Sequence, residues 1–187
     1  MALVRSSYRI IVLVFLFWSM LAGVARPVSD EVQSARALEI EAAFLVKFSS
    51  YIHWPEEAFS SPDAPLVISI FGRDPFGSII DTIARSYVMK GRNVEIRRCT
   101  DLRTLCGSHI VFVAGGAMDK LQTITVSAEG RPILLVGNAP DFLERGGMIN
   151  FVVVKNRIRF DINIKNSHRA GLEISSKLLK VARSIIQ

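Results

Sequence analysis

The sequence predicts one α/β domain, a three-layer sandwich with a mostly parallel sheet of about six strands, an antiparallel edge hairpin and helices on both faces. Short apolar runs without polar alternation recur along the chain, and such runs are typical of strands that are covered on both faces. Helical segments separate these runs, which favours parallel strand pairing. The last two strands are joined by a tight turn, which predicts a hairpin instead.

The first element is a long amphipathic helix over residues 30–52, where apolar residues return at helical spacing. Pro55 cannot continue a helix, so the chain passes into a loop. Residues 66–71 then form the first buried strand. Asp74 is expected to cap a helix over residues 75–85, because a proline occupies the first helical position after it.

The middle of the chain repeats the alternation of strand and helix. Val94 and Ile96 alternate with charged residues, so we expect a half-exposed strand that runs to Cys99. A buried strand, a helix and another buried strand follow at residues 110–114, 118–127 and 132–136. This order predicts helices on both faces of a parallel sheet.

The last part of the chain changes character. A short helical turn near residues 141–145 leads to a strand over residues 148–154, a tight turn at residues 155–156, and a strand over residues 157–162 in which apolar and polar residues alternate. These two strands form the predicted edge hairpin. Residues 175–186 place apolar side chains on one side and basic ones on the other, which predicts a final packing helix.

The first 25 residues have the order of a signal peptide. Arg5 and Arg9 precede an apolar run and small residues follow it, so we expect cleavage after Ala25 and export to the periplasm. The alternative is an uncleaved anchor, although the apolar run of residues 10–24 is shorter than the roughly 20 residues that cross a bilayer as a helix. The expected boundaries are a signal peptide at residues 1–25, a lead-in to the first helix at residues 26–37 and the α/β domain at residues 38–187.

The charge balance is mildly basic. The chain has 23 lysines plus arginines and 17 aspartates plus glutamates, and loss of Arg5 and Arg9 on cleavage leaves a net charge of about +4. The basic residues are scattered, and an exported protein does not meet the genome. Nucleic acid is therefore not expected as a partner.

Two cysteines, Cys99 and Cys106, lie seven positions apart in the part of the chain that is expected to reach the periplasm. In an oxidising compartment, a structural disulfide between them is the first expectation. A free pair of thiols and a redox role are the alternatives.

The sequence carries no recognisable catalytic constellation. His53, His109 and His168 share neither a helical turn nor a metal-ligand spacing, and the nucleophile-elbow, zinc-protease, P-loop and dinucleotide-binding motifs do not occur in it. We therefore expect a protein without enzymatic activity, metal or cofactor. An enzyme would need His109 or Asp161 beside a polar partner.

Five segments of the sequence are weak as single motifs but specific as an ordered set. They are residues 42–55, which include Tyr51-Ile52-His53-Trp54-Pro55, and residues 65–77, 106–113, 146–151 and 158–179. Together they resemble the YfiR-like family of periplasmic regulatory proteins, over about residues 38–184.

The resemblance implies a non-enzymatic periplasmic repressor. Such a protein would bind the periplasmic sensor region of an inner-membrane signalling protein, a diguanylate cyclase, and hold down cyclic-di-GMP synthesis. It would act by binding one conformation of the sensor better than the other, because differential affinity is what shifts a population. The resemblance also implies a homodimer and an outer-membrane lipoprotein as a further partner.

For a regulator, we expect an exposed apolar patch for partner binding around Trp54, Phe59, Phe151 and Phe160. The alternative is a periplasmic small-ligand-binding module that feeds a membrane receptor or sensor kinase. Its ligand would lie in the crevice at the strand ends, where open α/β sheets bind ligands. The residues expected around that crevice are Gly72, Arg73, Asp74, Gly115, Gly116 and Asn138.

Overall fold

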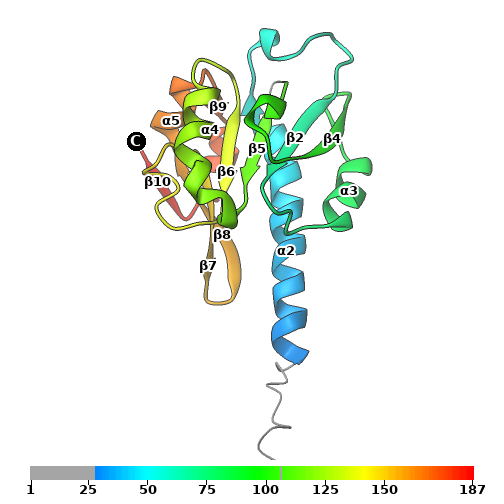
Figure 1. The fold of residues 1–187 in the computed structure, drawn as a ribbon, viewed down its shortest axis with the longest axis vertical. Helices are drawn as coiled ribbons and strands as arrows, with labels where there is room; N and C mark the ends of the chain where they lie inside the picture. Colours follow the sequence, from blue (N-terminus) through cyan, green and yellow to red (C-terminus); the bar gives the residue numbers. More distant parts are fainter. Residues whose placement is uncertain (1–27, 106) are drawn as a thin grey trace, which may run out of the picture. The chain divides into compact units, whose positions relative to one another are not determined.

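The computed structural model of the chain describes residues 28–105 and 107–187 (Figure 1). The expected signal peptide and Cys106 of the expected disulfide lie outside these residues, so both stay predictions. The chain divides into two units, residues 1–35 and 36–187. Of the first unit, the structure describes residues 28–35, which are helical. The second unit holds the strands and the remaining helices.

The predicted long helix is present as α2, Val28–Phe48. It passes through one 3-10 turn into the short strand β1, Ile52–His53, which pairs antiparallel with β9, Glu173–Ile174. The helix therefore ends four residues earlier than predicted. Ile52 is buried in this pairing, and Pro55 disfavours a helical conformation of Trp54, the residue before it.

The main sheet has eight strands in the order β10-β8-β7-β6-β5-β2-β4-β3 (Figure 1). The pairs β3–β4 and β7–β8 are antiparallel, and all other neighbours are parallel. All six predicted strands are present, and the predicted fold class is confirmed. The strands are β2 Leu66–Phe71, β3 Val88–Met89, β4 Arg92–Cys99, β5 Ile110–Val113, β6 Leu134–Gly137, β7 Ile149–Val154, β8 Arg157–Asn163 and β10 Ser184–Ile186.

Short helices and 3-10 turns connect the strands. The α-helices after α2 are α3 Ser78–Arg85, α4 Leu121–Ala128, α5 Ile164–Arg169 and α6 Ser176–Leu179. The 3-10 turns are η1 Ser49–Tyr51, η2 Glu56–Ala58, η3 Leu102–Leu105 and η4 Gly115–Lys120.

The strand register assigns the two faces of the sheet. Phe112, Val136 and Ile149 are paired neighbours on β5, β6 and β7, so their side chains share one face. On that face Phe112 contacts Phe76, just before α3, with 4.9 Å between ring centroids. Leu135 points to the opposite face, where it lines a cavity together with residues of α4 and α5. Helices thus lie on both faces, as predicted.

Four phenylalanines join α2 to the hairpin formed by β7 and β8. Phe48 stacks on Phe151, with 5.6 Å between ring centroids, and meets Phe160 edge-on at 5.2 Å. Phe44 meets Phe160 edge-on at 5.6 Å. Phe151 and Phe160 are directly paired across the hairpin, so the aromatic cluster binds the helix to both strands at once.

Two turns depend on particular backbone conformations. Lys155 and Asn156 both have positive φ, at 48° and 59°, which is the two-residue hairpin turn that was predicted. Phe142 is fully buried in the turn over residues 141–146. A Cβ atom on Gly147 would lie 2.1 Å from its ring, so only glycine fits there.

The prediction of a final helix over residues 175–186 is wrong. Only α6 is helical, and Ser184–Ile186 forms β10, which pairs in parallel with β8. The Arg183 N–H donates to the carbonyl oxygen of Phe160, and the Arg183 guanidinium pairs with Asp161 on β8. The backbone N–H and C=O groups of β8 that point away from β7 form hydrogen bonds with β10. The β7–β8 hairpin therefore lies inside the sheet and not at its edge.

The predicted helix cap at Asp74 is also wrong. The helix α3 begins at Ser78, and its N-cap is Gly77 with φ 57°. Asp74 Oδ1 instead accepts a hydrogen bond from the Phe76 N–H at 2.7 Å, and Oδ2 accepts one from Arg98 Nε at 2.8 Å. Asp74 thus stabilises the turn before the helix and ties that turn to β4.

Candidate functional site

The loop between β1 and β2 brings two of the predicted partner-binding residues together. Trp54 and Phe59 are both half-buried, and both line one surface cavity of about 720 Å³. The remaining lining residues come from the same loop, from the start of β1, and from the β3–β4 hairpin. They are Ile52, Pro55, Glu56, Ser60, Ser61, Pro62, Met89, Lys90 and Arg92.

His109 anchors this loop through two hydrogen bonds and a ring contact. Its Nδ1 accepts a hydrogen bond from the Val67 N–H at 3.0 Å, so the proton of the neutral ring is on Nε2, which donates to the carbonyl oxygen of Ala58 at 3.0 Å. The His109 ring also stacks on Phe59, with 4.3 Å between centroids. One side chain thus connects the start of β2 to the middle of the loop.

Burial keeps His109 neutral. The residue is 5% exposed, and burial lowers the pKa of His109 below its ordinary value. The positive charges of Arg92 and Arg97 lower this pKa further, while the hydrogen bond to Ala58 opposes the shift. The neutral form is the one that can both accept from Val67 and donate to Ala58.

Arg92 contacts the same loop through the Phe59 ring and two backbone carbonyl groups. Its guanidinium carbon lies 4.0 Å from the centre of the Phe59 ring, which is a cation–π contact. Arg92 Nη1 also donates to the carbonyl oxygens of Ser61 and Ala64, at 3.0 and 2.7 Å. We call the three stacked groups of Arg92, Phe59 and His109 the loop anchor. It fixes the loop backbone at three carbonyl groups and so pre-forms the cavity wall.

The cavity has an apolar floor and a charged rim. Ile52 and Met89 are buried beneath it, and Lys90 and Glu56 are exposed at its edge. Lys90 has φ 49° in the tight turn between β3 and β4, and this conformation places it at the tip of the turn. Such a site can take an apolar side chain of another protein and present charges to the groups around it.

Phe151 and Phe160 do not belong to this site. They are 3% and 2% exposed and lie in the aromatic cluster under α2. The expectation that they present an exposed patch is wrong, because α2 covers the face of the hairpin from which they project. Of the four residues expected at the partner surface, the structure brings together Trp54 and Phe59.

The crevice residues fall into separate groups. A Cβ atom on Gly72 would lie 2.9 Å from the Cβ of Ala117, so η4 packs directly against the end of β2. Asp74 is engaged by Arg98, as described above, and Arg73 stands beside it in the chain. Gly116 has open space where a Cβ would be.

Gly115 and Asn138 meet at the ends of β5 and β6, where α2 adds a residue that was not predicted. A Cβ atom on Gly115 would lie 3.6 Å from Asn138 Oδ1, and Asn138 Nδ2 donates to Glu41 Oε2 at 3.3 Å. Glu41 is 6% exposed; burial raises its pKa, and the hydrogen bond from Asn138 partly offsets this. Its position was visible in the sequence, three residues after Leu38 and four before Leu45 on the apolar stripe.

Three further findings bear on function. Cys99 is buried at the end of β4, and its expected partner lies outside the described residues. Within residues 28–105 and 107–187, no three His, Cys, Asp or Glu side chains are grouped so that they could hold a metal ion. In the same part of the chain, no helix has the length and apolar character to cross a membrane.

A comparison with families of known proteins identifies the family of the chain. Residues 38–183 match the family described as YfiR/HmsC-like. The matched segment begins within α2 and ends just before β10, so it includes the loop anchor and the cavity beside it.

Proposed function

The chain belongs to the YfiR/HmsC-like family, and from this premise we propose that it is a periplasmic regulator of cyclic-di-GMP signalling. It binds the periplasmic sensor region of an inner-membrane diguanylate cyclase and represses the enzyme. The protein itself acts by binding and not by catalysis. The observation that carries the proposal beyond the family is the pre-formed cavity between Trp54, Phe59 and Lys90.

The loop anchor supports this role because it reduces the entropic cost of binding. A loop of this length would ordinarily lose conformational freedom when a partner docks on it. Here hydrogen bonds from His109 and Arg92 already hold three of its carbonyl groups. A rigid surface also discriminates between two shapes of a sensor domain, and repression requires such discrimination.

The same proposal includes export by the signal peptide, a homodimer and an outer-membrane lipoprotein as a second partner. These rest on the family resemblance and on the sequence pattern of residues 1–25. The alternative, a receptor for a small ligand, needs an open crevice at the strand ends. Glu41 and Ala117 pack against two of the positions at that crevice, which favours the regulator.

Two lysines provide a matched pair of variants for the test. Lys90 at the cavity rim and Lys155 in the β7–β8 turn are both exposed, and both have positive φ, at 49° and 48°. Charge reversal to glutamate therefore carries the same backbone cost at both positions. We would express the full chain with Lys90→Glu or Lys155→Glu in its own host after deletion of the chromosomal gene, and measure cellular cyclic-di-GMP and cross-linking to membrane cyclases.

We expect deletion to raise cyclic-di-GMP, and the unaltered chain and Lys155→Glu to restore the low level. Lys90→Glu should leave the level high and weaken binding to the cyclase sensor domain by about tenfold or more, since a reversed charge at an interface rim is costly. Unchanged cyclic-di-GMP on deletion would contradict the proposed function. Full repression by Lys90→Glu would place the contact elsewhere.

A further inference from the structure

The strand β10 leaves one edge of the main sheet open. It is the terminal strand on the β8 side, and no described residue pairs with its outer edge. Its three residues are exposed, with Ile185 at 39% and Ile186 at 37%. Native sheets usually protect an edge by a very short strand, or with lysine, proline, a bulge or a covering element, and β10 is short, at three residues. Ser184, Ile185 and Ile186 include none of the protecting residue types.

The backbone groups that face outward can be identified. The Asn163 N–H donates to the carbonyl oxygen of Met148 next to β7, so Asp161 and Asn163 direct their backbone groups to β7. The Phe160 carbonyl oxygen accepts from the Arg183 N–H, so Phe160 and Ile162 direct theirs to β10. Successive residues of a strand direct their N–H and C=O groups to opposite sides. Ile185 lies opposite Ile162 in the parallel register, and a residue of a parallel pair bonds to the two residues that flank its partner. Ser184 and Ile186 therefore bond to β8, while Ile185 presents its N–H and C=O groups to the outside.

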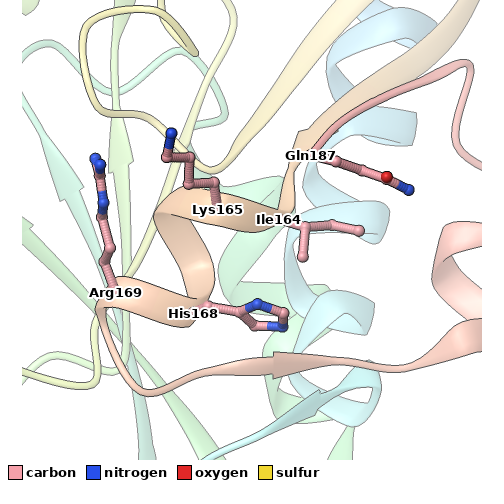
Figure 2. Close-up of a pocket in the computed structure, with 5 residues that line it drawn as sticks. All are labelled: Ile164, Lys165, His168, Arg169 and Gln187. Atoms are coloured by element: carbon pink, nitrogen blue, oxygen red, sulfur yellow. The ribbon is translucent and has the colours of Figure 1, made fainter.

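A cavity of about 670 Å³ lies between the end of this strand and α5. Figure 2 shows Ile164 and His168 on the side of α5 that is turned toward Gln187, with Lys165 and Arg169 on the other side of the helix. Ile164, His168 and Gln187 thus line a groove beside the open edge, and two exposed cations, Lys165 and Arg169, flank it.

The charge around the edge selects the chemistry of the partner. Residues 164–187 contain five lysines and arginines and a single glutamate, Glu173. One of the five, Arg183, is paired with Asp161, and the other four are Lys165, Arg169, Lys177 and Lys180. A second copy of this chain that added edge to edge would bring like charges together, which is unfavourable.

We propose that the open edge of β10 binds an extended acidic segment of another protein, which adds to the sheet as a further strand. The segment bonds to the outward N–H and C=O groups of Ile185 and places its carboxylates near Lys165 and Arg169. This is the strand-addition mode of peptide recognition, in which backbone hydrogen bonds give affinity and side chains give specificity. The inference does not depend on which sensor the Trp54 cavity binds.

The test uses the full chain and fluorescein-labelled peptides of about eight residues, the common length of a strand or slightly more. One peptide alternates valine with glutamate, one alternates valine with lysine, and one has the acidic composition but a central proline. Binding is followed by fluorescence anisotropy at two salt concentrations. Amide hydrogen exchange of Ile185 reports whether the peptide occupies the edge.

Two substitutions at one position separate backbone from side chain. Ile185→Pro removes an outward N–H and no N–H that faces β8, whereas Ile185→Val keeps both backbone groups. We expect the acidic peptide to bind, to slow exchange at Ile185, and to lose affinity at high salt. Ile185→Pro should weaken it about tenfold, as expected for one lost interfacial hydrogen bond, and Ile185→Val by less than about twofold.

Three results would overturn the proposal. They are no saturable binding of the acidic peptide up to roughly 1 mM, equal binding of the acidic and basic peptides, and unchanged affinity in Ile185→Pro. Concentration-dependent dimers that protect the Ile185 amide would assign the edge to a second copy instead. Circular dichroism of both variants verifies that the domain is folded, and none of these readouts involves the cyclase.

Discussion

Replacing His109 with phenylalanine tests whether this ring holds the loop before β2. The new ring can still stack on Phe59, but it has no nitrogen, so the Val67 N–H loses its acceptor and the Ala58 carbonyl loses its donor. Val67 is 3% exposed. A buried donor without a partner costs about 1–3 kcal/mol, and the second bond contributes about 1 kcal/mol more. The free energy of unfolding should fall by about 2–4 kcal/mol and Tm by roughly 5–15 °C.

The pH dependence of this loss provides a sharper check. The folded-state pKa of His109 lies below its ordinary value because burial disfavours the charged ring. The stability that the neutral ring contributes is therefore complete above about pH 6.5, the unfolded value, and is lost as the pH falls through the lower folded value. Phenylalanine does not titrate. The stability difference between the two proteins should narrow between pH 7.5 and pH 5.

Denaturant unfolding at several pH values measures this difference, and His53→Phe, at an exposed position, is the control. The control should match the unaltered protein within about 0.5 kcal/mol. A His109→Phe protein that is as stable as the parent, or a difference that stays constant with pH, would refute the assignment of His109 as a neutral anchor of the loop.

Three other substitutions have defined outcomes. Phe151→Ala should lower the free energy of unfolding by about 3–5 kcal/mol in denaturant titrations because it removes a ring from the aromatic cluster, while Val153→Ala, at a 66% exposed position two residues along the same strand, should change it by less than about 0.5 kcal/mol. Gly147→Ala places a Cβ in the ring of the neighbouring phenylalanine and should lower Tm sharply in a thermal melt, whereas Gly116→Ala meets nothing within 4 Å and should leave Tm near that of the parent. Glu41→Gln should become more stable relative to the parent as the pH rises above the ordinary glutamate pKa, because the raised folded-state pKa means that only the parent loses stability through that range; a pH series of unfolding curves that runs parallel for the two proteins would contradict this.

The sequence predicted those elements whose signal is local. The strands β2, β5 and β6 are buried on both faces, so their apolar runs are continuous and could be recognised without knowledge of their neighbours. The segment over residues 175–186 misled because its apolar spacing fits a helix. Its conformation is set by pairing with the side of β8 that β7 does not occupy, and β8 is not adjacent to this segment in the sequence.

The candidate site was predicted in part for the same reason. Trp54 and Phe59 are aromatic residues in a proline-containing loop, which is a visible signal. The loop anchor was not, because His109 and Arg92 belong to β5 and β4 ends that come together only when β2 inserts between those strands. No periodicity in the sequence shows that a histidine and an arginine 17 positions apart will stack on opposite sides of one ring.

The aromatic contact between α2 and the β7–β8 hairpin has a consequence for the order of folding. Phe48 and Phe151 are 103 positions apart in the chain, so this part of the core cannot close until most of the polypeptide has been synthesised. Closing such a long loop is entropically costly and slow compared with local helix formation. A nascent chain therefore cannot close this contact until the β7–β8 hairpin has been synthesised. For the proposed export, the placement of the first helix against the last hairpin would favour a chain that completes its core only after translation.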